Sequence, residues 1–407
     1  MPIRPLAILS LALCAALIPA ADGPSTVRLE RGADGAWTLV RNGEPFLVKG
    51  AGGKHHLDDL AAFGGNSIRT WGMGEDTPAL LDAAHARGIT VTLGFWMGHK
   101  RHGFDYGDAK RVQDQLARFE RDVRTYKDHP AVLAWAIGNE MELEQNGNVA
   151  MWQAINACAV AAKAIDPNHP MMTVIADLGP NGQNLAMIKA HCPDLDLIGV
   201  NSYGGVMNLA ERYRAHDPGR PYLITEYARN GSGHTRWGAE REKTSTGKAA
   251  AYAEIYREAI LGQPGLCLGG YTFLWGSKSE VTETFFGCYL KSGERTAAAE
   301  VYAELFGGKP PANRSPSIEP LAVDATTMTA GTQIRARTAA TDPDGDPLTW
   351  RWELRAELGR TMGGDHQDAS RAFADAVVAD GATATITAPA PGSYRLYVTC
   401  FDGQGNA

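Results

Sequence analysis

One pattern constrains the fold of this chain more than any other: short apolar runs alternate with helical patterns eight times between residues 46 and 306. We interpret the runs as strands, at 46–50, 66–71, 89–96, 129–140, 171–175, 197–201, 221–227 and 267–273. Continuous apolar runs are typical of parallel strands that are covered on both faces. The repeat predicts an α/β fold, a (β/α)8 TIM barrel. An open doubly wound sheet is disfavoured, since no Gly-rich phosphate turn follows the first strand.

Helical periodicity between the strands supports this interpretation. It is clearest for Val112, Leu116, Phe119, Val123 and Tyr126, which follow one another at steps of four and three residues. Further helices are predicted at 78–87, 149–165, 244–261 and 295–305.

A change of composition divides the chain after the barrel. Residues 22–306 form the predicted barrel domain with a short N-terminal β extension, and the Gly/Pro-rich stretch 307–316 is typical of a linker. Residues 317–407 alternate apolar and polar positions, as in the strand that carries Trp350 and Trp352, which predicts an Ig-like β-sandwich. Because the chain ends in the turn 402–407, this sandwich either lacks its last strand or takes it from elsewhere.

The N-terminus has the three parts of a secretory signal, which are Arg4, an apolar run from Leu6 to Leu17, and small residues near Ala20. We predict a signal peptide over 1–21 and a secreted or periplasmic protein without stable membrane insertion. A retained anchor is the alternative, but the run is shorter than the roughly 20 residues of a membrane span. Cys267 and Cys288 either form a disulfide or remain buried free thiols.

Composition narrows the class of partner. The chain is 44% hydrophobic and 21% charged, as in a globular protein with a large core. The net charge is -7 and the sequence has no Lys/Arg-rich run, so it does not predict the basic surface that binds nucleic acid or an anionic membrane. The sequence carries no signal for an oligomeric state.

Two glutamates close the fourth and seventh predicted strands. Glu140 follows the run that ends in Ile137-Gly138-Asn139, and Glu226 lies near the end of 221–227. The carboxyl ends of barrel strands open into the active site, so both carboxylates are placed for chemistry. A carboxylate pair of this kind suggests an acid/base and a nucleophile.

The segments around Asn139-Glu140 and Thr225-Glu226-Tyr227 resemble the clan A retaining glycoside hydrolases, most closely the catalytic barrel of family 2. The resemblance implies that Glu140 is the acid/base and Glu226 the nucleophile in hydrolysis of a neutral β-linked glycan. In such a double displacement the two carboxyl groups lie roughly 5 Å apart. The resemblance also implies that Asn139 binds the sugar hydroxyl next to the reacting carbon.

Further binding residues follow from the resemblance, each with a structural alternative. Arg69 would hold the nucleophile ionised, or form a salt bridge elsewhere, and Tyr203 would hydrogen-bond the nucleophile, or pack in the core. Trp275, after the eighth strand, is the first candidate for an aromatic platform under the sugar. Trp71 and Trp96 also follow strand ends and are either platforms or packing residues.

Metal and cofactor sites are not expected. The histidines at 55–56 and in the loop 99–106 lack the spacing of a zinc site, and the proposed chemistry needs neither a metal nor a cofactor. The acidic turn 342–346 could hold calcium, but a hairpin turn with solvated carboxylates is favoured. We interpret Glu142 and Glu144 as solvated loop charges.

Two alternative functions share these residues. In a β-glucanosyltransferase-type transglycosylase, a sugar hydroxyl replaces water in the second step, so product analysis separates it from a hydrolase. In a non-catalytic carbohydrate-binding barrel, the aromatic side chains would bind glycans without turnover.

Overall fold

The computed structural model describes residues 23–143, 145–216, 219–235, 238–357 and 368–407. The predicted signal peptide, residues 1–21, lies outside these ranges. Within them, no helix has both the length and the apolar character needed to cross a membrane.

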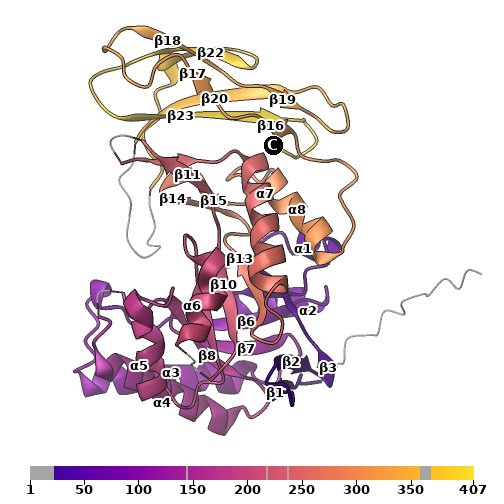
Figure 1. The fold of residues 1–407 in the computed structure, drawn as a ribbon, viewed down its shortest axis with the longest axis vertical. Coiled ribbons are helices and arrows are strands. Elements are labelled where there is room, and N and C mark those ends of the chain that lie inside the picture. Colours follow the sequence, from indigo (N-terminus) through magenta and orange to yellow (C-terminus); the bar gives the residue numbers. More distant parts are fainter. Residues whose placement is uncertain (1–22, 144, 217–218, 236–237, 358–367) are drawn as a thin grey trace, which may run out of the picture.

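The eight predicted strands form a closed parallel barrel in the order β4, β5, β6, β7, β8, β9, β10 and β13, which confirms the predicted fold class (Figure 1). Their bounds are Val48–Gly52, Ser67–Arg69, Thr90–Phe95, Val132–Ile137, Met171–Ala176, Leu197–Asn201, Tyr222–Tyr227 and Cys267–Thr272. Nearly every residue of these strands is buried, because side chains fill the barrel on one face and meet the helices on the other.

Helices surround the barrel. They are α1 Leu57–Ala62, α2 Thr77–His85, α3 Ala109–Tyr126, α4 Val149–Ile165, α5 Gln183–His191, α6 Leu209–Ala215, α7 Ser245–Ile255 with its continuation Tyr256–Leu261, and α8 Ala297–Phe306. Side-chain caps fix some of their starts, as where Asn148 accepts from the backbone N–H of Met151 at 3.3 Å and begins α4.

A small antiparallel sheet closes the amino-terminal end of the barrel. Its strands are β1 Val27–Arg31, β2 Trp37–Arg41 and β3 Glu44–Pro45. Val27 and Leu39 from this sheet pack on Leu133, Met172 and Leu268 of the barrel strands. The opposite end of the barrel is therefore the one left for a binding site.

Two hairpins rise from that opposite end. β11 Gly231–His234 and β12 Glu240–Glu242 follow the seventh barrel strand, and β14 Ser277–Glu280 and β15 Thr282–Gly287 follow the eighth. Figure 1 shows both hairpins between the barrel and the C-terminal module.

The C-terminal module consists of small antiparallel sheets. Strands β17, β18, β22 and β21 form one sheet, β20 pairs with β23, and β16 pairs with β19. Their bounds, in chain order from β16, are Ser317–Ile318, Ala322–Val323, Gln333–Arg337, Ala340–Thr341, Thr349–Ala356, Val377–Asp380, Thr383–Thr387 and Tyr394–Phe401. The module core contains Trp352, Leu354 and Ile386, with Trp350 partly buried beside them.

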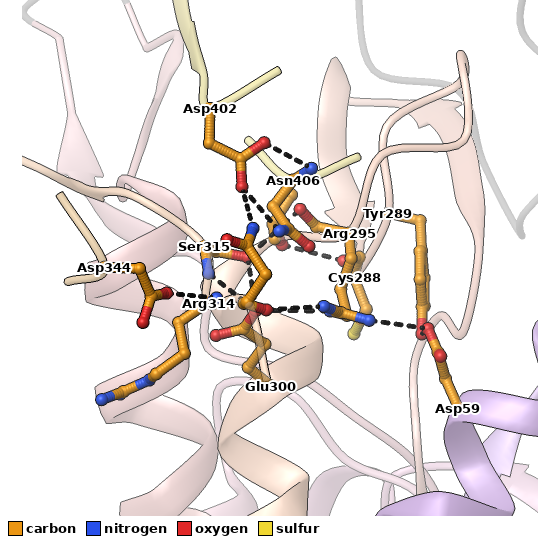
Figure 2. Close-up of polar contacts among 12 residues, drawn as sticks. Asp59, Cys288, Tyr289, Arg295, Glu300, Arg314, Ser315, Asp344, Asp402 and Asn406 are labelled. Atoms are coloured by element: carbon orange, nitrogen blue, oxygen red, sulfur yellow. Dashed lines mark hydrogen bonds and ion pairs between the residues drawn. The ribbon is translucent and has the colours of Figure 1, made fainter. Parts of the chain in front are cut away.

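The segment that joins barrel and module is fastened to both (Figure 2). Ser315 donates its backbone N–H to Glu300 of α8 at 2.7 Å, and Arg295 donates to the carbonyl of Asn313 at 3.0 Å. On the module side, Asn313 donates to Asp402 at 2.5 Å. The predicted linker 307–316 therefore includes a hydrogen-bonded junction.

The five described cysteines, Cys158, Cys192, Cys267, Cys288 and Cys400, are buried free thiols. Cys267 and Cys288 are therefore free thiols and do not form the disulfide that was the other interpretation.

Candidate active site

A cavity of about 1120 Å³ opens at the carboxyl ends of the barrel strands. Its lining includes both predicted catalytic glutamates and side chains from the two hairpins, such as Glu240 and Phe286. The structure thus brings Glu140 and Glu226 into one site, although they are 86 positions apart.

A tight turn at the end of β7 presents Glu140. Gly138 has φ +74°, and a Cβ at this position would lie 2.6 Å from the Met141 side chain, so glycine is required. Glu140 itself has φ +52°, a left-handed conformation that costs a non-glycine residue about 1–2 kcal/mol. Its backbone N–H donates to the carbonyl of Val174 in β8 at 2.8 Å and holds this turn in place.

The surroundings of Glu140 favour its protonated form. Burial raises its pKa to about 7, and the negative charge of Glu226 acts in the same direction. Asn201, at the end of β9, opposes this shift by donating its amide to Glu140 Oε1 at 2.9 Å. At neutral pH a large fraction of Glu140 therefore carries the proton that a general acid must donate.

Glu226, at the end of β10, is 5% exposed and faces three donors. Oε1 accepts from Arg69 at 2.9 Å and from the Trp71 indole at 2.7 Å, and Oε2 accepts from the Tyr203 hydroxyl at 2.5 Å. Burial, followed by the charge of Glu226, raises the pKa of Tyr203 well above its usual value, so Tyr203 keeps its proton. Donors directed at both oxygens stabilise an ionised carboxylate.

Asn139 links the two carboxylates. Its Oδ1 accepts from Arg69 Nη2 at 2.6 Å and from Asn201 Nδ2 at 3.2 Å. Because the oxygen is engaged in this way, the group that Asn139 can offer to a ligand in the cavity is its NH2 donor. The residues predicted around the glutamates thus form one hydrogen-bonded network, in which Arg69 contacts both Glu226 and Asn139.

Aromatic side chains form another part of the cavity surface. Trp71 and Trp96, the two further candidates for aromatic platforms, both line it, and Trp96 is 36% exposed. Trp71 packs edge-on against Phe273 at 5.6 Å between ring centroids, and Phe273 packs against Phe286 at 5.1 Å. Such faces match the apolar C–H surfaces of a sugar ring.

The prediction that placed Trp275 under the sugar is not supported by its position. Trp275 is 1% exposed, its indole donates to the carbonyl of His56 at 3.1 Å, and its ring packs against Tyr289 and Tyr302. It therefore fills the core beside the cavity. Phe273, two residues earlier at the end of β13, is the aromatic residue that lines the cavity there.

Glu142 is not the solvated loop charge that was predicted. It is 4% exposed, and its Oε1 accepts from the Ala176 backbone at 2.6 Å and from Asn184 at 3.2 Å. Its Oε2 is buried without a hydrogen-bond partner. Burial raises the pKa of Glu142 to about 8, so its carboxyl group is neutral at pH 7. Glu144 lies outside the described residues.

Several cavity residues were missed by the sequence analysis. Asn201 could have been found as a polar residue at the end of a barrel strand. Lys278, Glu280 and Phe286 belong to the β14–β15 hairpin, for which we had no prediction.

One cluster of carboxylates lies in the C-terminal module. Ligand oxygens of Asp342, Asp346 and Asp402 lie within 4.8 Å of one another, and no other group of this kind occurs among the described residues. Asp402 is already engaged, since it accepts from the backbone of Gln404 at 2.7 Å and from Asn313. Of the three carboxylates, Asp402 also belongs to the hydrogen-bonded junction in Figure 2.

Comparison with known proteins agrees with the barrel fold. Residues 80–247 match the model of glycosyl hydrolases family 2, TIM barrel domain, and this range contains both Glu140 and Glu226. A search of the curated proteins found no match.

Solved structures with the same fold include three uronidases. A GH2 β-galacturonidase from Eisenbergiella tayi bound to galacturonate and a β-D-glucuronidase for Dictyoglomus thermophilum each have TM-score 0.54 and 17% identity, covering 70% of this chain and 54% of theirs. A β-glucuronidase from Ruminococcus gnavus has TM-score 0.53 and 18% identity, covering 69% and 52%. The chain thus spans about half the length of these structures, and the likeness shows a shared fold.

Proposed function

We propose that this protein, whose residues 80–247 match the model of the TIM barrel domain of glycosyl hydrolases family 2, is a retaining β-glycoside hydrolase. The observation that carries the proposal is the contrast between two carboxyl groups in one cavity. With a pKa of about 7, Glu140 carries a proton in about half of the molecules at pH 7, and the oxygens of Glu226 accept from Arg69, Trp71 and Tyr203. An acid and an ionised nucleophile are the pair that a double displacement needs.

The proposed reaction has two steps. In the first, Glu226 attacks the anomeric carbon as Glu140 transfers its proton to the leaving oxygen, so the glycosidic bond breaks and a glycosyl ester forms. In the second, Glu140, now ionised, takes a proton from water, which attacks the same carbon and releases Glu226. The Asn139 NH2 group donates to the hydroxyl beside the reacting carbon in both steps.

We propose a neutral sugar as the substrate. The two cations that line the cavity among the described residues each face a carboxylate already: Arg229 faces Glu254 at 2.9 Å, and Lys278 faces Glu280 at 2.7 Å. Arg69, buried beside the cavity, faces Glu226. Glu240 adds a further carboxylate to the lining, and Asp177, which also lines the cavity, is paired with Arg212 at 2.5 Å. A sugar carboxylate would have to compete for these cations, so the uronides named for the structural neighbours are the less favoured substrates.

We also propose that the enzyme acts outside the cytoplasm, because its N-terminus has the composition of a secretory signal. Mass spectrometry of the secreted protein would show a new N-terminus near residue 21 if the signal is cleaved.

The function is tested by a substrate screen. The mature protein, Glu140→Gln and Glu226→Gln are assayed on aryl β-glucosides, β-galactosides, β-mannosides and β-glucuronides and on β-glucan oligomers. We expect turnover of a neutral substrate, and a loss of about 10² to 10⁴-fold in Glu140→Gln that is smallest for the most acidic leaving groups, which need least protonation. Turnover of the β-glucuronide alone would contradict the neutral-sugar proposal. Equal glycan binding by all three proteins without turnover would support the non-catalytic alternative, and longer oligomers among the products would identify a transglycosylase.

A further inference from the structure

We propose that the C-terminal module positions one wall of the active site, and that Tyr397, Arg395 and Glu283 are the positioning residues. This wall, which we call the hairpin wall, consists of the cavity-lining residues of the β11–β12 and β14–β15 hairpins, namely Gly231, Glu240, Lys278, Glu280, Val281, Phe285 and Phe286. The module does not itself line the cavity with any described residue. Its effect would pass through the hairpins that lie between it and the barrel (Figure 1).

The first contact fastens the β14–β15 hairpin to the module. The backbone N–H of Glu283 in β15 donates to the Tyr397 hydroxyl of β23 at 3.1 Å. The Glu283 carboxylate accepts from the Ser370 backbone of the module at 2.8 Å and from Ser279 of β14 at 2.9 Å. Glu283 therefore ties both strands of the hairpin to the module.

The second contact fastens the β11–β12 hairpin. Arg395 of β23 donates to the carbonyl of Glu240 at 2.9 Å, and Glu357 of the module holds the same guanidinium at 2.8 Å. Tyr397 and Arg395 are two positions apart on one strand, so their side chains leave the same face of β23. One strand of the module thus contacts both hairpins.

A buried ion pair joins the two hairpins to each other. Glu242 of β12 pairs with Lys248 of α7 at 2.5 Å and also accepts from Thr284 of β15 at 2.8 Å. Asn230, just before β11, donates to the carbonyl of Phe285 at 2.6 Å. A displacement of either hairpin would therefore be transmitted to the other.

The hairpin wall reaches the reacting groups through aromatic contacts. Phe286 of β15 packs on Tyr203 at 5.3 Å between ring centroids, and Tyr203 donates to Glu226. The module is thus connected to the proposed nucleophile through Glu283, Phe286 and Tyr203. Because the contact involves the side of the cavity and not the carboxylates directly, loosening it should raise KM more than it lowers kcat.

Two single-atom deletions on β23 test this inference. Tyr397→Phe removes the hydroxyl that accepts from Glu283, whereas Tyr394→Phe removes a hydroxyl that donates to Ala390 inside the module, at 2.9 Å. In hydrogen exchange of the full chain, we expect peptides covering 277–287 to exchange about three- to tenfold faster in Tyr397→Phe and unchanged in Tyr394→Phe. The kinetic expectation, a threefold or larger rise in KM in Tyr397→Phe alone, rests on the proposed function.

Glu283 provides a second, independent variant. Glu283→Ala should accelerate exchange of the same peptides, and Glu283→Gln should restore most of the protection because its side-chain oxygen can still accept from Ser370. Exchange in Tyr397→Phe equal to that of Tyr394→Phe would overturn the inference. Since exchange is measured without substrate, that result is distinct from a failure of the glycosidase proposal.

Discussion

The two walls of the cavity differ in what holds them. The strand wall, which we define as Asn139, Glu140, Asn201 and Glu226, stands at the ends of barrel strands. Hydrogen bonds of 2.6 to 3.2 Å join these residues to one another and to the buried Arg69. The hairpin wall stands on insertions after the seventh and eighth strands and depends on a separate module for support. In the proposed function, the reacting groups thus belong to the barrel strands, and the hairpins supply mainly contact surface for the substrate.

The sharpest test of this division removes one carboxylate from each wall. Glu226→Gln should lower kcat/KM by at least about 10⁴-fold, because the amide cannot form the glycosyl ester. Glu240→Gln, a matched change in the hairpin wall, should cost less than about tenfold. Steady-state kinetics on the substrate found in the screen would measure both, and losses of similar size would break the comparison.

A second prediction concerns the buried carboxyl group of Glu142, two positions after Glu140 of the strand wall. The pKa of Glu142 is raised from 4.5 to about 8, so its contribution to stability is complete below pH 4.5 and is lost as the pH rises to about 8. The part of the unfolding free energy that is lost with rising pH amounts to roughly 3 to 5 kcal/mol. Between pH 5 and pH 9, the free energy of unfolding in urea should therefore fall more for wild type than for Glu142→Gln. The side-chain oxygen of this variant can still accept from Ala176.

A constant difference between the two proteins across this range would mean that Glu142 is not buried as a neutral acid. Glu258→Gln, a change at an exposed position of the surface, serves as the control and should leave the pH dependence unchanged.

The pH profile of catalysis supplies a third test of the strand wall. With the pKa of Glu140 near 7, kcat/KM should fall about tenfold per pH unit on the alkaline side of neutrality, because the acid loses its proton. Removing the opposing Asn201 hydrogen bond in Asn201→Ala should move this limb to higher pH. Phe286→Ala, in the hairpin wall, should leave its position unchanged, and an equal shift in both variants would contradict the assignment.

The smallest effect is expected for the hairpin wall itself. Phe286→Ala removes an aromatic surface from the cavity and a contact to Tyr203, and it should raise KM about three- to tenfold with a smaller change in kcat. Kinetics with an aryl glycoside and with a longer oligomer would measure this. A large fall in kcat with KM unchanged would place Phe286 in the chemistry instead.

The sequence predicted the strand wall well because its signals are local. A buried barrel strand is a continuous apolar run, so the ends of β7 and β10 could be located, and Glu140 and Glu226 followed from them. Arg69 and Tyr203 contact Glu226, and it was the resemblance to clan A, rather than a local pattern, that suggested these contacts. Asn201 was missed, although it ends a predicted strand in the same way.

The hairpin wall was not predicted because its signals are not local. β14 is a short polar strand, Ser277–Glu280, that pairs with the adjacent strand β15. The hairpin they form contacts the C-terminal module, which is far away in sequence. Trp275 was wrongly predicted to lie under the sugar, because its closeness in sequence to the end of β13 does not show which way the chain turns after that strand. Glu142 was misjudged because loop carboxylates are usually solvated, whereas this one is held by the Ala176 backbone.

The central claim is that Glu226 forms a covalent bond to the sugar. The most direct measurement incubates the enzyme with a 2-deoxy-2-fluoro glycoside of the sugar found in the screen, bearing a good leaving group, and maps the adduct by mass spectrometry. Fluorine slows both steps, and the leaving group keeps the first one fast, so the ester accumulates. We expect one adduct, on the peptide that contains Glu226. Turnover of the parent glycoside with inverted configuration, or an adduct on any other residue, would contradict it.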